Sequence, residues 1–403
     1  MRRRPVAMGG RPFRRRRARC PERSGRSELP VPRRVRAAHR GDYRAAIPAS
    51  IAGLAVVPIG AQTSALATEA ATEIARFDAE FGASTMAFAP LLLRCESASS
   101  SQIERLTSSA RAIALADLRR TGRNNADLIV RNVRAMQAAL NLAERLDGDA
   151  ILAMHRVLMD AYWPDIAGRW REQQVWIGGS RFGPHEADFI PPHHDRVPAA
   201  IADLAAFMAR PDLPVLTQAA IAHAQFETIH AFPDGNGRVG RALIHALLKA
   251  GGLARSVTVP VSASLLGDTG TYSAALTAYR AGDPEPIVKV MAEVTFPAIG
   301  NGRRLAADLR ATRARWADVI TARRGAAAHR LADLLIQHPA IDMPLVAREL
   351  SLATSNAQHA IDRLVGDGVL RLIGKGARDR VWEAPEVISA LDGFAKRAKR
   401  RAT

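Results

Sequence analysis

Residues 230–241, HAFPDGNGRVGR, bring together side chains that suit phosphate chemistry. His230 carries an imidazole, the side chain whose ordinary pKa fits a general base near neutrality. Asp234 offers a carboxylate oxygen of the kind that Mg²⁺ uses when it also binds phosphates. A base and a metal-binding carboxylate therefore lie within one short stretch.

The same stretch predicts a cradle for phosphate groups. We expect a helix to begin near Arg238, so that its unpaired N–H groups and positive dipole end face the preceding residues. Gly235 and Gly237 let the backbone adopt conformations closed to other residues and let a ligand approach closely. Arg238 and Arg241 share one face of that helix, and each guanidinium can hold a phosphate through two hydrogen bonds. The sequence predicts a phosphate site beside a base.

Two other interpretations of this region stay open. Residues 235–237 alone are typical of a simple turn, and a lone histidine is more often a buried structural residue. His223, Glu227 and His230 have the spacing of one helix face, which is compatible with a zinc site, although such sites usually need a further ligand. The joint occurrence of base, carboxylate, glycines and arginines favours phosphate chemistry. His223 and Glu227 are then expected to support the loop through hydrogen bonds.

The rest of the chain is predicted to be mainly helical and to hold this loop between two helices. Apolar residues recur at spacings of three and four, the helical period. Helices are predicted at residues 64–81, 86–118, 125–146, 149–162, 195–208, 216–230, 238–250, 271–280 and 284–323. Residues 173–192 depart from this period, and their two β-prone runs around a glycine-rich middle predict a small hairpin.

A separate unit is predicted at residues 326–403. Three short helices, at 329–337, 344–351 and 355–366, precede two short strands around a basic turn, an arrangement typical of a winged helix-turn-helix. DNA binding and plain protein contact remain alternatives for it. The polar side chains that would contact DNA are Asn356, Gln358, His359, Arg363, Lys375, Arg378 and Arg380.

Net charge is a poor guide to partners, because it is concentrated at one end. The chain has 403 residues and a net charge of +18, and residues 1–40 hold fifteen arginines against two glutamates. Such a segment cannot bury a core, so residues 1–42 are predicted to be a disordered extension. No apolar stretch is long enough to span a membrane. The two cysteines, Cys20 and Cys95, are too few for a disulfide framework, which fits a reducing cytoplasm.

The loop at residues 230–241 resembles the signature of the Fic family, His-Pro-Phe-x-Asp/Glu-Gly-Asn-Gly-Arg-x-x-Arg. Ala231 stands where the family usually has proline. The resemblance extends from about Tyr43 to the end of the chain's last unit. It implies a helical Fic core at residues 121–325, preceded by a helical region at 43–120. It also implies an enzyme that transfers AMP from ATP, with Mg²⁺, to a Ser, Thr or Tyr hydroxyl of a target protein.

The resemblance assigns a role to each residue of the loop. His230 would deprotonate the attacking hydroxyl, Asp234 would hold Mg²⁺, and Phe232 would anchor the loop from below. Tyr272 is placed in the region where the family holds adenine, with Tyr279 nearby. The phosphate groups would be bound by Gly235, Asn236, Gly237, Arg238 and Arg241.

A built-in inhibitor is also implied. The family carries a Ser/Thr-x-x-x-Glu-Gly/Asn helix whose glutamate binds the second arginine of the loop. Ser100 and Glu104 match that pattern, whereas Arg105 replaces the glycine or asparagine. We therefore expect Glu104 to pair with Arg241 and to restrain the enzyme.

The predicted hairpin corresponds to the family's flap, which pairs with an extended segment of the target protein. Trp176, Ile177, Gly178 and Gly179 would form its target-binding edge. Two alternatives to AMP transfer stay open: removal of AMP by the same site, and a DNA-binding regulator that uses the Fic core as a nucleotide sensor. A homodimer is a further alternative to a monomer.

Overall fold

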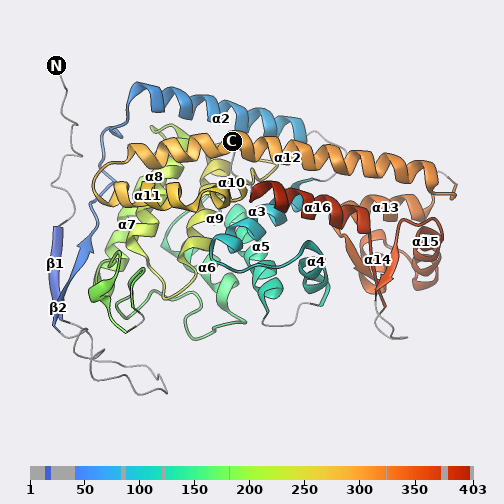
Figure 1. Ribbon diagram of the computed structural model, residues 1–403, viewed down its shortest axis with the longest axis horizontal. Helices are drawn as coiled ribbons and strands as arrows, with labels where there is room; N and C mark the ends of the chain where they lie inside the picture. Colours follow the sequence, from blue (N-terminus) through green and yellow to red (C-terminus); the bar gives the residue numbers. More distant parts are fainter. Residues whose placement is uncertain are drawn as a thin grey trace. The chain divides into compact units, whose positions relative to one another are not determined.

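The computed structural model describes residues 14–19, 41–82, 88–119, 124–180, 182–323, 325–373 and 380–399, the first range by its backbone alone. The protein is mainly helical, as predicted (Figure 1). It divides into two compact units, each assembled from separate stretches of sequence. One contains the described residues up to Glu69, Ala138–Gly251 and Gly270–Ala292, and the other contains Ala70–Gln137, Gly252–Thr269 and the described residues from Glu293 onward.

The first unit is built around a buried central helix, α8. All residues of α8 but its first are buried, so the helix has neighbours on every side. It packs against α7 and most extensively against α9 (Figure 1). The helices of this unit are α6 (Gly148–Met159), α7 (Val197–Met208), α8 (Val215–Ile229), α9 (Asn236–Ala250) and most of α11 (Thr269–Arg280).

A strand pair lies at the start of the described chain. Strand β1 (Arg14–Arg19) pairs antiparallel with β2 (Asp42–Ile47). The sequence predicts no regular structure in residues 1–42, and for these six residues and the start of β2 the structure differs. Strand pairing uses backbone groups, so an arginine run that cannot build a core can still extend a sheet. The remainder of residues 1–40 lies outside the described part.

The predicted hairpin at residues 173–192 is shorter than expected. Ile177 and Phe189 form a single antiparallel bridge, with N–H···O distances of 2.9 and 3.2 Å. A 3₁₀ turn, η1 (Pro184–Glu186), lies in the connection. Gly178 and Gly179 both have left-handed φ angles, +74° and +68°, which end the extended conformation directly after the bridge. We call residues 173–192 the flap.

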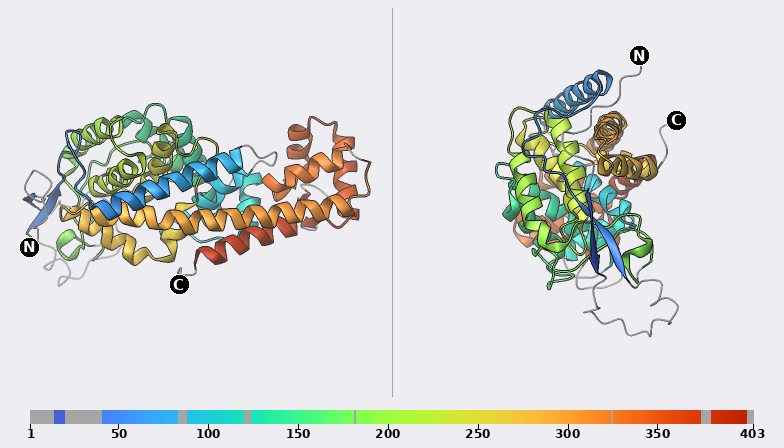
Figure 2. Two further views of the ribbon diagram at one scale, coloured as in Figure 1. Left: turned by 90° about the horizontal axis from the view of Figure 1, so that it is seen from above. Right: turned by 90° about the vertical axis from the view of Figure 1, so that its left-hand side faces the viewer.

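Two long helices contribute to both units. Helix α2 (Ala61–Gly82) lies alongside α12 (Glu285–Val319) in both views (Figures 1 and 2). In the first unit, the Thr63 hydroxyl donates to Glu285 at 2.6 Å, and in the second, Arg303 pairs with Glu80 at 2.9 Å. Among the described residues, no helix combines the length and the apolar character that a membrane crossing requires.

The second unit holds a helix that the sequence predicts to run on without a break from residue 86 to 118. It is instead two helices, α3 (Ala89–Ile103) and α4 (Ala110–Arg119). Buried Glu96 of α3 accepts hydrogen bonds from the backbone N–H, at 2.8 Å, and the hydroxyl of Ser262 in α10 (Val261–Gly267). Helix α10 was not predicted. The unit also contains most of α5 (Asn125–Asn141).

The break after α3 is a left-handed turn at Arg105. Arg105 has φ +62°, and the N–H of the next residue, Leu106, donates back to Ser101 O at 3.0 Å. This is the position after a helix end where glycine or asparagine is favoured, because neither suffers much from a positive φ. Arg105 therefore adopts a conformation that suits glycine or asparagine, at a cost of about 1 kcal/mol.

The C-terminal segment contains the predicted helices with small shifts in their ends. They are α13 (Ala327–Gln337), α14 (Met343–Leu350) and α15 (Thr354–Gly366). A three-stranded sheet follows the order β3 (Ala340–Asp342), β5 (Val381–Glu383), β4 (Arg371–Ile373). Strand β3 and helix α16 (Pro385–Ala398) were not predicted. The winged-helix assignment stays a prediction, and Lys375 and Arg378 lie outside the described residues.

Candidate active site

The candidate site is the turn from α8 to α9, and His230 is where the chain reverses. Helix α8 ends at Ile229, and His230 follows in the left-handed conformation, with φ 51° and ψ 61°. Helix α9 begins at Asn236, slightly earlier than predicted, after Gly235 at φ +86°. Non-glycine residues with positive φ are uncommon, and strain of this kind concentrates at functional positions.

Asn236 locks the turn from inside. Its side-chain oxygen accepts from Phe232 N at 2.9 Å, and its side-chain nitrogen donates to Phe232 O at 2.8 Å. Both ends of one amide are therefore engaged by one backbone residue, which fixes the width of the loop. Because the side-chain amide is occupied in this way, Asn236 would contact a phosphate through its backbone N–H.

Phe232 is the buried anchor that the resemblance implied. Its ring is stacked on the imidazole of His155 in α6, with centroids 3.7 Å apart and planes within 4°, and Trp170 stacks at 5.1 Å. Ala231 beside it is fully buried, and its carbonyl accepts from Arg171 N at 3.0 Å. The underside of the loop is therefore held by aromatic packing and by the segment that precedes the flap.

His155 links this packing to Asp234. Its Nδ1 accepts from Gly168 N–H at 3.0 Å, so its Nε2 carries the proton that is donated to Asp234 O, also at 3.0 Å. Burial lowers the pKa of His155 to about 4, although the Asp234 carbonyl and carboxylate favour the protonated form. His155 is thus a neutral hydrogen-bond donor that positions Asp234.

The start of α9 presents unused donors. The N–H groups of Asn236, Gly237 and Arg238 belong to the first turn, which has no partner within the helix, and no side chain caps it. Arg238 is 5% exposed; one of its terminal nitrogens donates to Asp234 at 3.1 Å. Its Nε is buried without a hydrogen-bond partner in the described part of the protein. Such a buried donor is costly unless an acceptor binds there.

The other predicted groups lie in the same unit. The Asp234 side chain is 48% exposed, so a carboxylate oxygen remains accessible to a hard cation. Arg241 is buried one turn further along α9. The His230 imidazole is 20% exposed, and its Nδ1 lies 3.9 Å from Glu227. The loop thus brings together the base, the carboxylate and both arginines that the sequence predicted.

His223 and Glu227 do not form a metal site with His230. His223 Nε2 lies 2.6 Å from the hydroxyl of Tyr272, and burial, followed by the charge of Arg241, lowers the pKa of His223 to about 3. The three side chains are not close enough to share one ion. Tyr272 is buried against α8, and its role in adenine binding stays a prediction.

Gly240 explains how these groups pack so closely. A Cβ at this position would lie 2.9 Å from a Glu227 carboxylate oxygen and 3.1 Å from His223 Nδ1. Helix α9 can therefore lie directly against the polar face of α8 only because this residue has no side chain. The position falls on an unspecified residue of the signature, and sequence reasoning missed it.

The predicted inhibitory pair lies in the second unit. Ser100 is buried in α3, while Glu104 is exposed and caps the C-terminus of that helix, so it is not on the helix itself. Arg241 belongs to the first unit. The pairing of Glu104 with Arg241 stays a prediction.

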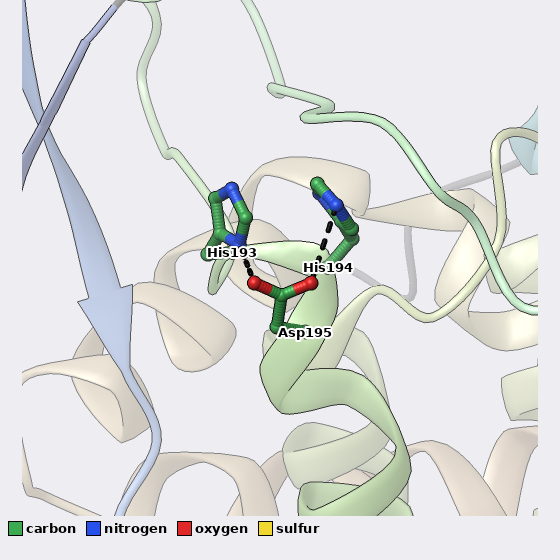
Figure 3. A group of neighbouring side chains, drawn as sticks. All are labelled: His193, His194 and Asp195. Carbon is green, nitrogen blue, oxygen red and sulfur yellow. Dashed lines mark ion pairs between the residues drawn. The ribbon is translucent and has the colours of Figure 1, made fainter.

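A second group of potential metal ligands follows the flap. His193, His194 and Asp195 converge at the start of α7, where η2 (His194–Arg196) begins (Figure 3). His193 Nδ1 lies 3.1 Å from one Asp195 oxygen, and His194 Nε2 lies 3.3 Å from the other. Each imidazole N–H can donate to one carboxylate oxygen, which accounts for the arrangement without an ion.

The family model for Fic/DOC proteins matches residues 145–248, which contain this loop, the flap and helices α6 to α8. This chain carries a Fic domain. Two curated relatives are a protein adenylyltransferase, fic-1, of Caenorhabditis elegans, 31% identical over 36% of this chain, and a probable protein adenylyltransferase of Aquifex aeolicus, 38% identical over 21%. The chain covers about a quarter of the length of each, 26% and 24% respectively.

A solved structure extends the likeness of the fold beyond the Fic domain. The Fic family protein from Desulfovibrio desulfuricans matches 81% of this chain and 96% of its own, with a TM-score of 0.51 and 21% identity. The prediction of a Fic-type helical fold is therefore confirmed. The family model itself stops well short of the range from Tyr43 to the chain's end over which we expected the resemblance.

Sequence reasoning missed the supports of the Fic loop, which precede it by many residues. His155, Trp170 and Arg171 each contact the loop from a segment with no local motif. The available signal was His155, a histidine on the apolar face of a predicted helix. That pattern is equally typical of a structural core residue.

The two buried imidazoles predict an acid-sensitive fold. An unfolded imidazole gains a proton near pH 6.5, whereas those of His155 and His223 stay neutral until about pH 4 and about pH 3. Between these values the unfolded state binds more protons, so the free energy of unfolding falls as pH falls, by up to about 1.4 kcal/mol per pH unit for each histidine. Denaturant unfolding between pH 7 and 5 measures this.

His155→Gln keeps a donor for Asp234 O and removes one of the two titrating groups. The slope of the free energy of unfolding against pH should then lose the contribution of one histidine, up to about 1.4 kcal/mol per pH unit. His359→Gln, an exposed histidine of α15, is the matched control and should leave the slope unchanged. An equal slope in wild type and His155→Gln would contradict the assignment.

Proposed function

We propose that the protein transfers AMP from ATP to a hydroxyl group of a target protein. The observation that carries this proposal is the buried guanidinium of Arg238 beside the first amides of α9, with an Nε that has no hydrogen-bond partner among the described residues. These donors suit the phosphates of a nucleotide. The names of the curated relatives, protein adenylyltransferases, support the choice of AMP as the transferred group.

His230 acts as the general base. It caps the C-terminus of α8, six residues before the start of α9, and its Nδ1 lies 3.9 Å from Glu227. The imidazole takes the proton from the attacking hydroxyl while that oxygen forms its bond to the α-phosphorus of ATP. The bond to the β-phosphate oxygen breaks, and pyrophosphate leaves.

The α9 terminus stabilises the charge that develops on the phosphates. The amides of Asn236, Gly237 and Arg238 are fixed before ATP binds, because Gly235 and the Asn236–Phe232 hydrogen bonds hold the turn. Fixed donors need no reorganisation during the reaction, which is how such sites lower a barrier. Arg238 and Arg241 neutralise the departing pyrophosphate.

The carboxylate of Asp234 fits Mg²⁺. It is a hard oxygen donor, half exposed, and its backbone carbonyl is held by His155. When bound, Mg²⁺ would neutralise charge between the α- and β-phosphates. Arg238 donates to one oxygen of this carboxylate, which leaves the other oxygen for the cation.

The free edge of the flap is suited to hold the target. Ile177 exchanges both of its backbone hydrogen bonds with Phe189, so the backbone groups of Trp176, the residue before it, point to the other side. Ile190 accepts from Ala46 N at 2.9 Å, which occupies the opposite edge with β2. An extended segment of the target protein could pair there, beside Trp176 and Ile177.

Replacement of the base tests the proposal. His230→Ala should reduce the rate of AMP transfer by about a hundredfold or more, because no other group takes the proton. ATP binding should persist, since the α9 donors are unchanged. Incorporation of α-labelled ATP into purified protein measures transfer, and calorimetry measures binding; His359→Ala is the matched control. Undiminished transfer in His230→Ala would refute the role.

We further propose that Glu104 restrains the enzyme. Glu104→Gly should raise auto-AMPylation about tenfold or more, because the γ-phosphate would no longer compete with a carboxylate for Arg241. The comparison is made with Mg²⁺ and ATP on purified protein. Glu144→Gly removes an exposed glutamate and should have no effect. An unchanged rate in Glu104→Gly would count against the restraint.

Two alternatives receive less support. Removal of AMP would use the same groups with water as the nucleophile, and only the relative rates distinguish it. For DNA binding, two of the expected contact residues of α15 are engaged within the protein: Gln358 donates to Asp362 at 2.7 Å, and Arg363 donates to Thr321 at 2.7 Å. His230→Ala would leave any DNA binding intact.

A further inference from the structure

Arg171 is a buried cation whose hydrogen bonds go to main-chain oxygens. Its side chain, in a residue only 2% exposed, donates from Nε to His230 O at 2.8 Å and from Nη1 to Gln173 O at 2.9 Å. From Nη2 it donates to Pro192 O and, at 3.5 Å, to Ile229 O. One guanidinium therefore gathers four carbonyls from three places in the chain.

Two of these acceptors form the C-terminus of α8. Ile229 is the last residue of the helix and His230 its cap, so their carbonyls lack partners within the helix and lie at its negative end. A cation is favourable at that end. Burial lowers the pKa of Arg171 to about 10, which still leaves the side chain charged at neutral pH.

The other two acceptors mark the two ends of the flap. Gln173 begins that segment and Pro192 ends it, so the same guanidinium closes the loop of chain between them. The backbone of Arg171 adds a further link, from its N–H to Ala231 O. The peptide groups on both sides of His230 are thus tied to the base of the flap.

Another arginine contacts the flap at Phe189, in the segment that lies between Ile177 and β2. The Arg280 guanidinium of α11 lies 3.9 Å from the centre of the Phe189 ring and donates to Glu227 O at 3.4 Å. Together with the β2 bond at Ile190, this leaves the edge at Trp176 and Ile177 as the side open to a partner. Its distance from His230 is then set at the flap's base, where Arg171 lies.

We propose that Arg171 is a positioning residue that fixes the distance between the target-binding flap and the catalytic base. The inference rests on the proposed AMP transfer. A target segment paired with the flap beside Trp176 brings its hydroxyl to His230 only if flap and imidazole move as one body. Arg171 also stabilises the left-handed backbone of His230, through the hydrogen bond to its carbonyl.

Lysine cannot replace this residue. It keeps the positive charge but has one nitrogen, which cannot reach carbonyls on three separate segments with the geometry of a planar guanidinium. Arg171→Lys therefore separates the charge at the end of α8 from the bridging of the flap. Arg169→Lys, at an exposed position two residues earlier, is the matched control.

The test combines hydrogen exchange, nucleotide binding and AMP transfer on the full chain. In Arg171→Lys, exchange at the Ile177 and Phe189 amides should accelerate about tenfold or more. The Kd for ATP with Mg²⁺, measured on the His230→Ala background to prevent turnover, should change by less than about threefold, because Arg171 does not contact the α9 donors. Auto-AMPylation should fall about tenfold or more. Arg169→Lys should match wild type in all three.

Unchanged exchange in the flap, or loss of ATP binding in parallel with transfer, would overturn the proposal. If Arg171→Lys does not fold, hydrogen exchange on the wild-type protein is the test instead. The Ile177 and Phe189 amides should then exchange about a hundredfold more slowly than unprotected amides, although they belong to a single bridge. Exchange at the rate of unprotected amides would overturn the proposal. A wild type that transfers no AMP would refute the proposed function, whereas the exchange measurement would still test the role of Arg171.

Discussion

The site depends on one sharp reversal of the chain between two packed helices. Helix α8 is buried on all sides, and α9 lies against it so closely that a Cβ on Gly240 would meet Glu227 and His223. The connecting turn has to fit that narrow spacing, and it does so with His230 in the left-handed conformation and Gly235 at φ +86°. His230 and the first amides of α9 therefore lie at the two ends of this one short turn.

The supports of this turn come from side chains that perform no chemistry themselves. Asn236 fixes its width, His155 holds the Asp234 carbonyl, and Phe232 is stacked between aromatic rings. Arg171 attaches the turn to the flap. Each of these groups is buried and neutral, or buried and bonded to carbonyls, so none of them adds an unpaired charge beside Asp234, Arg238 and Arg241.

The loop and the helices could be predicted from sequence, whereas the supports could not. The glycines, arginines and histidine of residues 230–241 carry their chemistry in their types and spacing, and helical periodicity is a local property. Arg171 and His155 act on residues far along the chain, through contacts that only the fold creates. The break at Arg105 was missed because apolar spacing continues across it, and strand β1 because pairing depends on the backbone rather than on composition.

The central claim is that this turn holds ATP with its α-phosphorus open to attack. Parallel incubation of the purified protein with Mg²⁺ and ATP, labelled either on the α-phosphate or on the γ-phosphate, tests it most directly. The account predicts that protein-bound label comes from the α-phosphate, with a mass increase of one AMP group, and none from the γ-phosphate. Protein-bound γ-label would identify a kinase reaction and contradict the account.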